Sequence, residues 1–136
     1  MKKYLVIGNP IEHSLSPKLH NFWFKDNNIN AIYEKQKINE NEIEGIISEV
    51  KKKKLNGINV TVPFKKAVIP YLDQLSLEAE STQSVNTIYL INDKVVGHNT
   101  DISGFELGVK NSKFEITGKK ILILGAGGVV PSIIFA

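Results

Sequence analysis

Cysteine and arginine are both absent from the 136-residue sequence, whose seventeen basic side chains are all lysine. Without cysteine the chain has no disulfide, no thiol nucleophile and few ways to build a structural zinc site, and a reducing, cytoplasmic location is the default expectation. The three histidines lack metal-ligand spacing. The longest apolar run, near Ile121–Leu124, is far shorter than the roughly 20 residues of a membrane span. The sequence therefore predicts neither a metal site nor a membrane partner.

A strong charge of one sign is also missing. Seventeen basic against fourteen acidic side chains leave a net charge of +3, too small to indicate a nucleic-acid partner unless it is concentrated. The one concentration is Lys51–Lys54, which closes a helical pattern with Ile43, Ile47 and Val50 on one face. Cations are favourable at the carbonyl end of a helix, so we interpret this run as a solvated helix end. A basic interaction module is the weaker alternative.

Strand and helix patterns alternate along the chain. Apolar runs bounded by turn residues predict strands at Tyr4–Gly8, Ala31–Lys37, Gly57–Val62, Asn86–Ile91, Val95–His98 and Lys119–Leu124. Apolar stripes and cap residues predict helices at Pro17–Asn27, Asn41–Lys54, Lys66–Leu72, Ser76–Thr82 and Ile102–Asn111. The turn Asn92-Asp93-Lys94 signals a hairpin. Together these predict an α/β fold: a mainly parallel sheet with helices on both faces and one antiparallel hairpin strand.

A second unit is expected to begin near residue 115. The predicted strand Lys119–Leu124 follows a long connection and runs into Gly125-Ala126-Gly127-Gly128. This opens a new β-α unit, which stops at Ala136 after one strand and a partial helix. The expected domains are therefore residues 1–114 and an incomplete unit at residues 115–136.

Polar side chains collect where the predicted strands end, and in open parallel sheets ligands bind beyond those carboxyl ends. Asn59 and Thr61 share one face of a strand expected to be buried, which is unusual unless something polar lies there. The hairpin brings Asn86 to the edge where Asp101 follows the outgoing strand. The side chains expected to converge on this rim are Ser14, Ser16, Asn59, Thr61, Lys65, Asn86 and Asp101. Such a set suits a small, polyhydroxylated, anionic molecule.

Each of these residues also has a simpler interpretation. Ser16 precedes Pro17 and can serve only as a helix cap. Asn99, Thr100 or Asp101 can likewise cap the next helix, and Asn86 can satisfy a turn. A single exposed lysine is usually solvated. Their joint placement at one edge of the sheet favours a binding site over these separate roles.

Four segments carry a resemblance to a known family: His13-Ser14-Leu15-Ser16-Pro17-Lys18-Leu19-His20-Asn21, Gly57-Ile58-Asn59-Val60-Thr61-Val62-Pro63-Phe64-Lys65, Val85-Asn86-Thr87 and Gly97-His98-Asn99-Thr100-Asp101. In this order they resemble the signature series of the shikimate dehydrogenases, and the resemblance runs from Tyr4 to the final residue. It implies a substrate domain followed by a Rossmann domain, and reduction of 3-dehydroshikimate to shikimate with NADPH. The implied partner is the small substrate, and a homodimer is compatible with the resemblance.

The resemblance also implies a role for each rim residue. Ser14 and Ser16 match the pair that holds the substrate carboxylate. Contacts to the ring hydroxyls are implied for Asn59, Thr61, Asn86 and Asp101. Lys65 and Asp101 match the catalytic pair. This agrees with the chemistry, because a ketone that receives hydride develops negative charge, which a nearby ammonium can stabilise and protonate.

The glycine-rich segment resembles the family's cofactor loop. Gly125, Ala126, Gly127, Gly128 and Val129 imply backbone amides that meet a pyrophosphate of NADP at a helix start. Pro131 stands where many relatives have a basic residue, and Gln83-Ser84 stands where they commonly have Gly-Ala. Because the sequence ends at Ala136, we expect an incomplete Rossmann β-α unit. Two alternatives stay open: a quinate/shikimate dehydrogenase, which can prefer NAD, and a non-catalytic shikimate-binding fragment.

Overall fold

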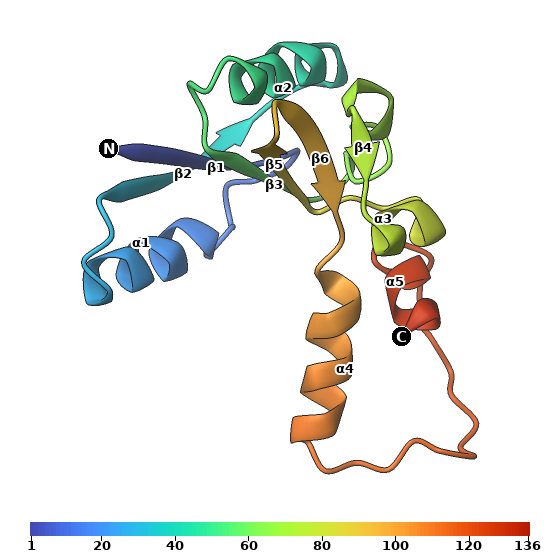
Figure 1. The fold of residues 1–136 in the computed structure, drawn as a ribbon. Coiled ribbons are helices and arrows are strands. Elements are labelled where there is room, and N and C mark those ends of the chain that lie inside the picture. Colours follow the sequence, from blue (N-terminus) through green and yellow to red (C-terminus); the bar gives the residue numbers. More distant parts are fainter.

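A six-stranded mixed sheet forms the centre of the computed structural model, which describes residues 1–136 (Figure 1). Its strands are β1 (Lys2–Gly8), β2 (Ala31–Lys37), β3 (Gly57–Val60), β4 (Gln74–Leu75), β5 (Thr87–Ile91) and β6 (Lys94–His98). They lie in the order β2-β1-β3-β5-β6-β4, and only β5 runs antiparallel to its neighbours. The predicted α/β class, with one antiparallel hairpin strand, is confirmed.

Helices cover both faces of this sheet. The α-helices of the chain are α1 (Ser16–Asp26), α2 (Ile43–Lys51), α3 (Leu77–Thr82), α4 (Asp101–Asn111), which projects away from the sheet (Figure 1), and α5 (Val130–Phe135). Single 3-10 turns lie at Glu40–Glu42 and Ile69–Tyr71. Leu5 and Ile7 of β1 pack in the main core with α2, because alternate side chains of a strand point to opposite faces. Val6 lies on the other face, in a smaller cluster with Phe24 of α1. Figure 1 shows α1 and α2 on opposite sides of the sheet.

Gly8, at the end of β1, permits a close approach that shapes the polar rim. A Cβ atom at this position would lie 2.6 Å from Cγ2 of Thr61 and 3.1 Å from the carbonyl oxygen of Val62. Only glycine leaves room for Thr61, whose N–H donates to the carbonyl of Ile7 at 3.0 Å. The ends of β1 and β3 are thereby held side by side.

Two predicted elements are wrong, one short strand was missed, and one helix ends earlier than predicted. Lys119–Leu124 forms no strand: the segment is extended, has no partner strand, and leaves Leu122 and Leu124 81% and 88% exposed. The helix predicted at Lys66–Leu72 is only the 3-10 turn at its end. The short strand β4 carries no sequence signal, because two residues are too few to show alternation. The helix predicted to end at Lys54 ends at Lys51.

The lysine run lies at an exposed helix end, as interpreted from the sequence. Lys51 contacts Asp73 at 3.2 Å, Lys53 contacts Asp93 at 2.9 Å, and Lys52 and Lys54 both approach Glu49. These pairs balance the local charge, which counts against a basic interaction module.

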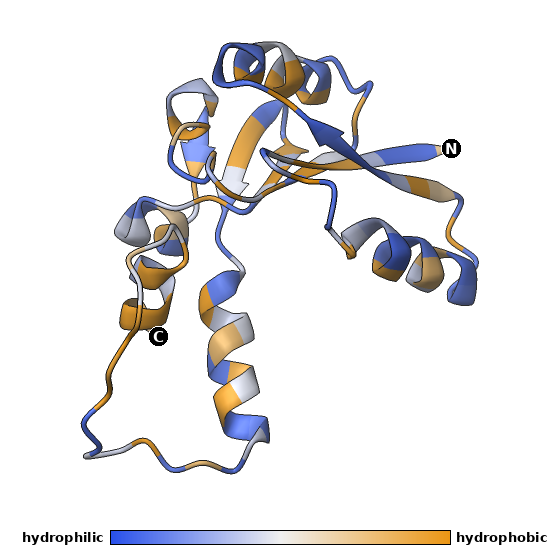
Figure 2. Cartoon of the chain, turned by 180° about the vertical axis from the view of Figure 1, so that it is seen from behind, coloured by the Kyte–Doolittle hydropathy of each residue, from blue (hydrophilic) through white to orange (hydrophobic).

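After β6 the chain extends away from the sheet and then folds back toward α3. Helix α4 projects from the end of β6, and the following segment loops back so that α5 lies against α3 and α4 (Figure 1). Figure 2 shows that α5 is mostly hydrophobic. No helix in the structure is both long and apolar enough to span a bilayer.

Candidate active site

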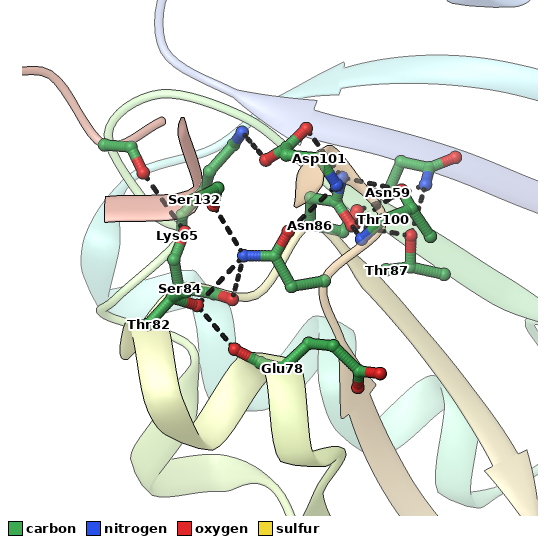
Figure 3. Close-up of polar contacts among 12 residues, drawn as sticks. Asn59, Lys65, Glu78, Thr82, Ser84, Asn86, Thr87, Thr100, Asp101 and Ser132 are labelled. Carbon is green, nitrogen blue, oxygen red and sulfur yellow. Dashed lines mark hydrogen bonds and ion pairs between the residues drawn. The ribbon is translucent and has the colours of Figure 1, made fainter. Parts of the chain in front are cut away.

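An ion pair between Lys65 and Asp101 lies at the edge where the strands end. Nζ of Lys65 is 2.7 Å from Oδ2 of Asp101, and the two side chains are only 13% and 22% exposed. Lys65 follows the loop after β3, whereas Asp101 is the first residue of α4, directly after β6. Figure 3 shows the two side chains pointing toward one another. A shielded ion pair of this kind keeps both charges in fixed positions.

Asn86 holds the other carboxylate oxygen of this pair. Its Nδ2 donates to Oδ1 of Asp101 at 2.9 Å and to Oγ1 of Thr100 at 2.8 Å. Its Oδ1 accepts the N–H of Thr100 at 3.0 Å and the hydroxyl of Thr87 at 2.9 Å. Both donors of the amide are therefore used inside the protein (Figure 3). Asn86 thus orients Asp101 and holds the N–H of Thr100 just before α4, and Asn86 itself lies in no turn.

Only the side-chain oxygen of Asn59 remains able to contact a ligand, because its nitrogen is fully used within the protein. Its Nδ2 donates to the carbonyl of Asn86 and to Oγ1 of Thr87, both at 3.1 Å. Its Oδ1 accepts the hydroxyl of Tyr33 at 2.6 Å. A carbonyl accepts but never donates, so these partners fix the orientation of the amide. The oxygen retains a lone pair and can accept a bond from a ligand hydroxyl.

Tyr33 of β2 is a site residue that sequence reasoning missed. It is 3% exposed, and its backbone N–H and carbonyl are both bonded to the Asn21 side chain, at 2.9 Å and 2.8 Å. The His20 ring stacks on it with centroids 4.2 Å apart. Burial raises the pKa of the Tyr33 phenol, an effect that the neighbouring Ser16 hydroxyl partly offsets. An aromatic residue within a strand indicates core packing, so the sequence held no signal for this role.

Ser14, Ser16 and Thr61 line a cavity of about 280 Å³ beside Pro10 and His13. The predicted cap role of Ser16 is wrong. Ser16 is the first residue of α1, Leu15 occupies the cap position, and no side chain caps the helix. Instead, Oγ of Ser14 accepts the N–H of Ser16 at 3.3 Å, because Ser14 begins a tight turn. The hydroxyl of Ser16 makes no hydrogen bond that would support the helix.

The glycine-rich segment lines a second cavity, of about 470 Å³, that also contains Lys65 and Lys66. Ala126, Gly127 and Gly128 line it, whereas Gly125 and Val129 lie just outside. A Cβ at Gly128 would be 3.9 Å from Cδ of Lys65, so the loop lies directly beside the ion pair. The lining contains two ammonium groups and no carboxylate. This donor set fits an anionic group such as a phosphate.

The fold and the polar rim at the ends of the strands define a ligand-binding α/β domain. Residues 6–88 match the family model described as the shikimate dehydrogenase substrate binding domain. The chain belongs to this family.

Relatives and solved structures agree with that assignment. The shikimate dehydrogenase (NADP(+)) of Pelagibacter ubique is 58% identical over 135 residues, which cover 99% of this chain and 51% of the relative. Shikimate dehydrogenase from Thermus thermophilus, solved with NADP(H) and shikimate, superposes on 99% of the chain and 51% of that structure, with a TM-score of 0.91 and 33% identity. Shikimate 5-dehydrogenase from Listeria monocytogenes was solved with shikimate and NAD. Its match covers 99% of this chain and 47% of that structure, with a TM-score of 0.90 and 33% identity. The chain spans about half the length of the curated relatives it matches.

Proposed function

We propose that these residues form the substrate half of an enzyme that reduces 3-dehydroshikimate to shikimate with NADPH. The observation that carries this proposal is the shielded Lys65–Asp101 pair, whose lysine lines the 470 Å³ cavity beside the glycine loop. Residues 1–114 serve as the substrate domain, and residues 115–136 begin the nucleotide-binding domain. Relatives that are 58% and 41% identical to the chain are named shikimate dehydrogenase (NADP(+)).

The substrate is held from two sides. Ser14 and Ser16 bind its carboxylate through their hydroxyls in the 280 Å³ cavity. Thr61 and the oxygen of Asn59 contact ring hydroxyls, and Asn59 acts only as an acceptor because both of its donors are already used. Asp101, whose two oxygens are bonded to Lys65 and Asn86, also contacts a ring hydroxyl. Asn86 reaches the substrate only if it gives up one of its protein bonds, so its main contribution is to orient Asp101.

The chemistry follows from the ion pair. NADPH, when bound, supplies the hydride to the carbonyl carbon. The ammonium of Lys65 stabilises the negative charge that develops on the carbonyl oxygen and donates the proton that completes the hydroxyl. Asp101 holds Lys65 in place at 2.7 Å and accepts from the neighbouring substrate hydroxyl. The amides of Gly125–Val129 together with Lys66 would hold the phosphates of the cofactor.

The test uses two proteins. Shikimate is titrated into the 136-residue chain by calorimetry, and a fusion of this chain to the C-terminal half of the Pelagibacter ubique relative is assayed for NADPH oxidation with 3-dehydroshikimate. We expect the short chain to bind shikimate without turnover, and the fusion to be active. In the fusion, Lys65→Ala should lower kcat by about 10²–10⁴-fold, the usual contribution of an acid–base group. Lys54→Ala, an exposed lysine paired with Glu49, is the control.

A large increase in KM with unchanged kcat would make Lys65 a binding residue instead. Absence of shikimate binding by both proteins would refute the proposal. Two finer points are decided by the same fusion. Quinate in place of shikimate tests for a quinate/shikimate dehydrogenase. NADH in place of NADPH shows how far residues 1–136 influence the choice of cofactor, because the C-terminal half of the fusion stays the same. A homodimer and a cytoplasmic location stay predictions.

A further inference from the structure

Every fully buried polar residue in the chain belongs to one cluster, which lies behind the ion pair. Its members are Thr82, Ser84, Asn99 and Ser132, which are 7%, 3%, 1% and 0% exposed. Burying polar groups costs free energy unless they are bonded, and an apolar core would serve stability as well. None of the four is given a substrate or cofactor contact above, although Thr82 and Ser84 also line the 470 Å³ cavity. Their concentration at one place therefore calls for a local explanation.

Asn99 is the centre of this cluster, and its side-chain oxygen and nitrogen bond two different parts of the chain. Its Oδ1 accepts the backbone N–H of Asp101 at 2.9 Å. Its Nδ2 lies 2.8 Å from Oγ of Ser132, 2.9 Å from the carbonyl of Ser84 and 3.1 Å from Oγ1 of Thr82. Figure 3 shows Thr82, Ser84 and Ser132 close together in this cluster. One buried side chain thus connects the backbone of the catalytic pair with the helix that follows the glycine loop.

A second bond fixes the loop itself. Oγ of Ser84 donates to the carbonyl of Gly128 at 3.1 Å, and Gly128 lies against the stem of Lys65. Apolar packing alone does not hold this region, because Ile134 and Phe135 of α5 remain 70% and 52% exposed. A six-residue helix is also too short to be stable by itself. The polar cluster therefore supplies the specific contacts that place the loop.

We propose that Asn99 is a positioning residue, which fixes the glycine loop relative to the Lys65–Asp101 pair through its bond to Ser132. This inference rests on the proposed function and extends it. Hydride transfer demands that the reacting atoms approach to about 3–3.5 Å, and a displacement of about 1 Å can cost about 10²-fold in rate. The Asn99 side chain is bonded both to Asp101 and to Ser132, which follows the glycine loop. It therefore holds the loop on the cofactor side at a constant distance from the catalytic pair on the substrate side.

Hydrogen exchange on the 136-residue chain tests the contact without any assumption about activity. Ser132→Ala removes one hydroxyl and leaves Asn99 in place. We expect the amides of Ile133–Ala136 to exchange about three- to tenfold faster, the range that the loss of one hydrogen bond gives. Amides of β1 and β3 should be unchanged. Ser48→Ala, at a half-buried serine of α2, is the matched control. Unchanged exchange in α5 would overturn the inference.

Kinetics of the fusion separate positioning from mere support of the fold. Ser132→Ala, assayed well below its melting temperature, should lower kcat about tenfold while the KM for shikimate stays within about twofold. A second variant, Ser84→Ala, releases Gly128 and should show the same split. A change in melting temperature with unchanged kcat would show that the cluster only supports the fold. An unmutated fusion that binds shikimate but oxidises no NADPH would refute the proposed function, and hydrogen exchange would still decide whether Ser132 holds the loop.

Discussion

Replacement of Tyr33 by phenylalanine removes one oxygen from the floor of the site. The Tyr33 hydroxyl donates to Oδ1 of Asn59 at 2.6 Å, and the ring is 3% exposed. Because burial raises the pKa of this phenol, the hydroxyl stays protonated and donates throughout the neutral range. The variant keeps the ring that stacks on His20, so its effect isolates the hydroxyl.

The structure sets the size of the effect. Loss of a neutral hydrogen bond costs about 1 kcal/mol, and an acceptor left without its partner costs up to about 3 kcal/mol when it is fully buried. Asn59 is half-buried, so we expect a loss of about 1–2 kcal/mol in the free energy of unfolding. For a chain of this length that corresponds to a decrease in Tm of about 3–10 °C. Shikimate affinity should fall about fivefold, because the Asn59 oxygen and the neighbouring Ser16 hydroxyl both lose a fixed partner.

Thermal melts and calorimetric titration of the 136-residue chain measure both quantities. Tyr71→Phe is the matched control, since Tyr71 is 41% exposed and lines a different cavity, with Glu44 and Asp73. A double variant with Asn59→Ala shows whether the two residues act together, because the Tyr33→Phe effect should then shrink. If Tyr33→Phe melts within about 1 °C of the control and binds shikimate equally well, Tyr33 has no part in the site.

Two further predictions concern α1. Ser14→Ala should lower the free energy of unfolding by up to about 1 kcal/mol, because the Ser14 hydroxyl supports the N–H of Ser16. Ser16→Ala should leave Tm nearly unchanged, and both variants should weaken shikimate binding. A larger loss of Tm in Ser16→Ala than in Ser14→Ala would contradict the structure. Burial lowers the pKa of His20 below its usual 6.5, so the unfolded chain takes up a proton that the folded chain resists, and stability should fall as the pH decreases below about 6.5. Urea unfolding between pH 8 and pH 5.5 measures this, and His20→Phe should abolish the component due to this residue.

The sheet was predictable because its strands carry strong local signals. The buried run of β1 ends at Gly8 as predicted, whereas β3 ends at Val60, two residues before the predicted Val62. Positive φ angles at Asn92 and Asp93 match the expected hairpin turn. Lys119–Leu124 has an equally strong apolar pattern, yet it forms no strand. A strand needs a neighbour to satisfy its backbone groups, and pattern alone does not show whether one is present.

The site was predictable in outline and not in its connections. Topology brings Lys65 and Asp101 together, since both follow strands that end at the same edge. Sequence gave no signal for the hydroxyl of Tyr33, which reaches Asn59 from a strand two positions away in the sheet. The cap assigned to Ser16 failed for a related reason: a Ser-x-Ser pair allows either hydroxyl to support the turn, and only the backbone conformation decides between them.

Asn59 and Asn86 of the rim, and Asn99 in the buried cluster behind it, share a property that explains how tasks are divided within the site. Both amide hydrogens of Asn59, Asn86 and Asn99 are donated to protein acceptors. A fully bonded amide cannot rotate without breaking several hydrogen bonds at once, so each one fixes its neighbours in a single arrangement. The groups that keep bonding capacity for a ligand are different in kind: the hydroxyl of Ser16, the ammonium of Lys65 and the oxygen of Asn59, each of which also has one partner in the protein. Ligand contacts thus fall on a few groups, whose positions the asparagines set before any ligand arrives. A preorganised site of this kind pays little in entropy or reorganisation when charge develops on the substrate.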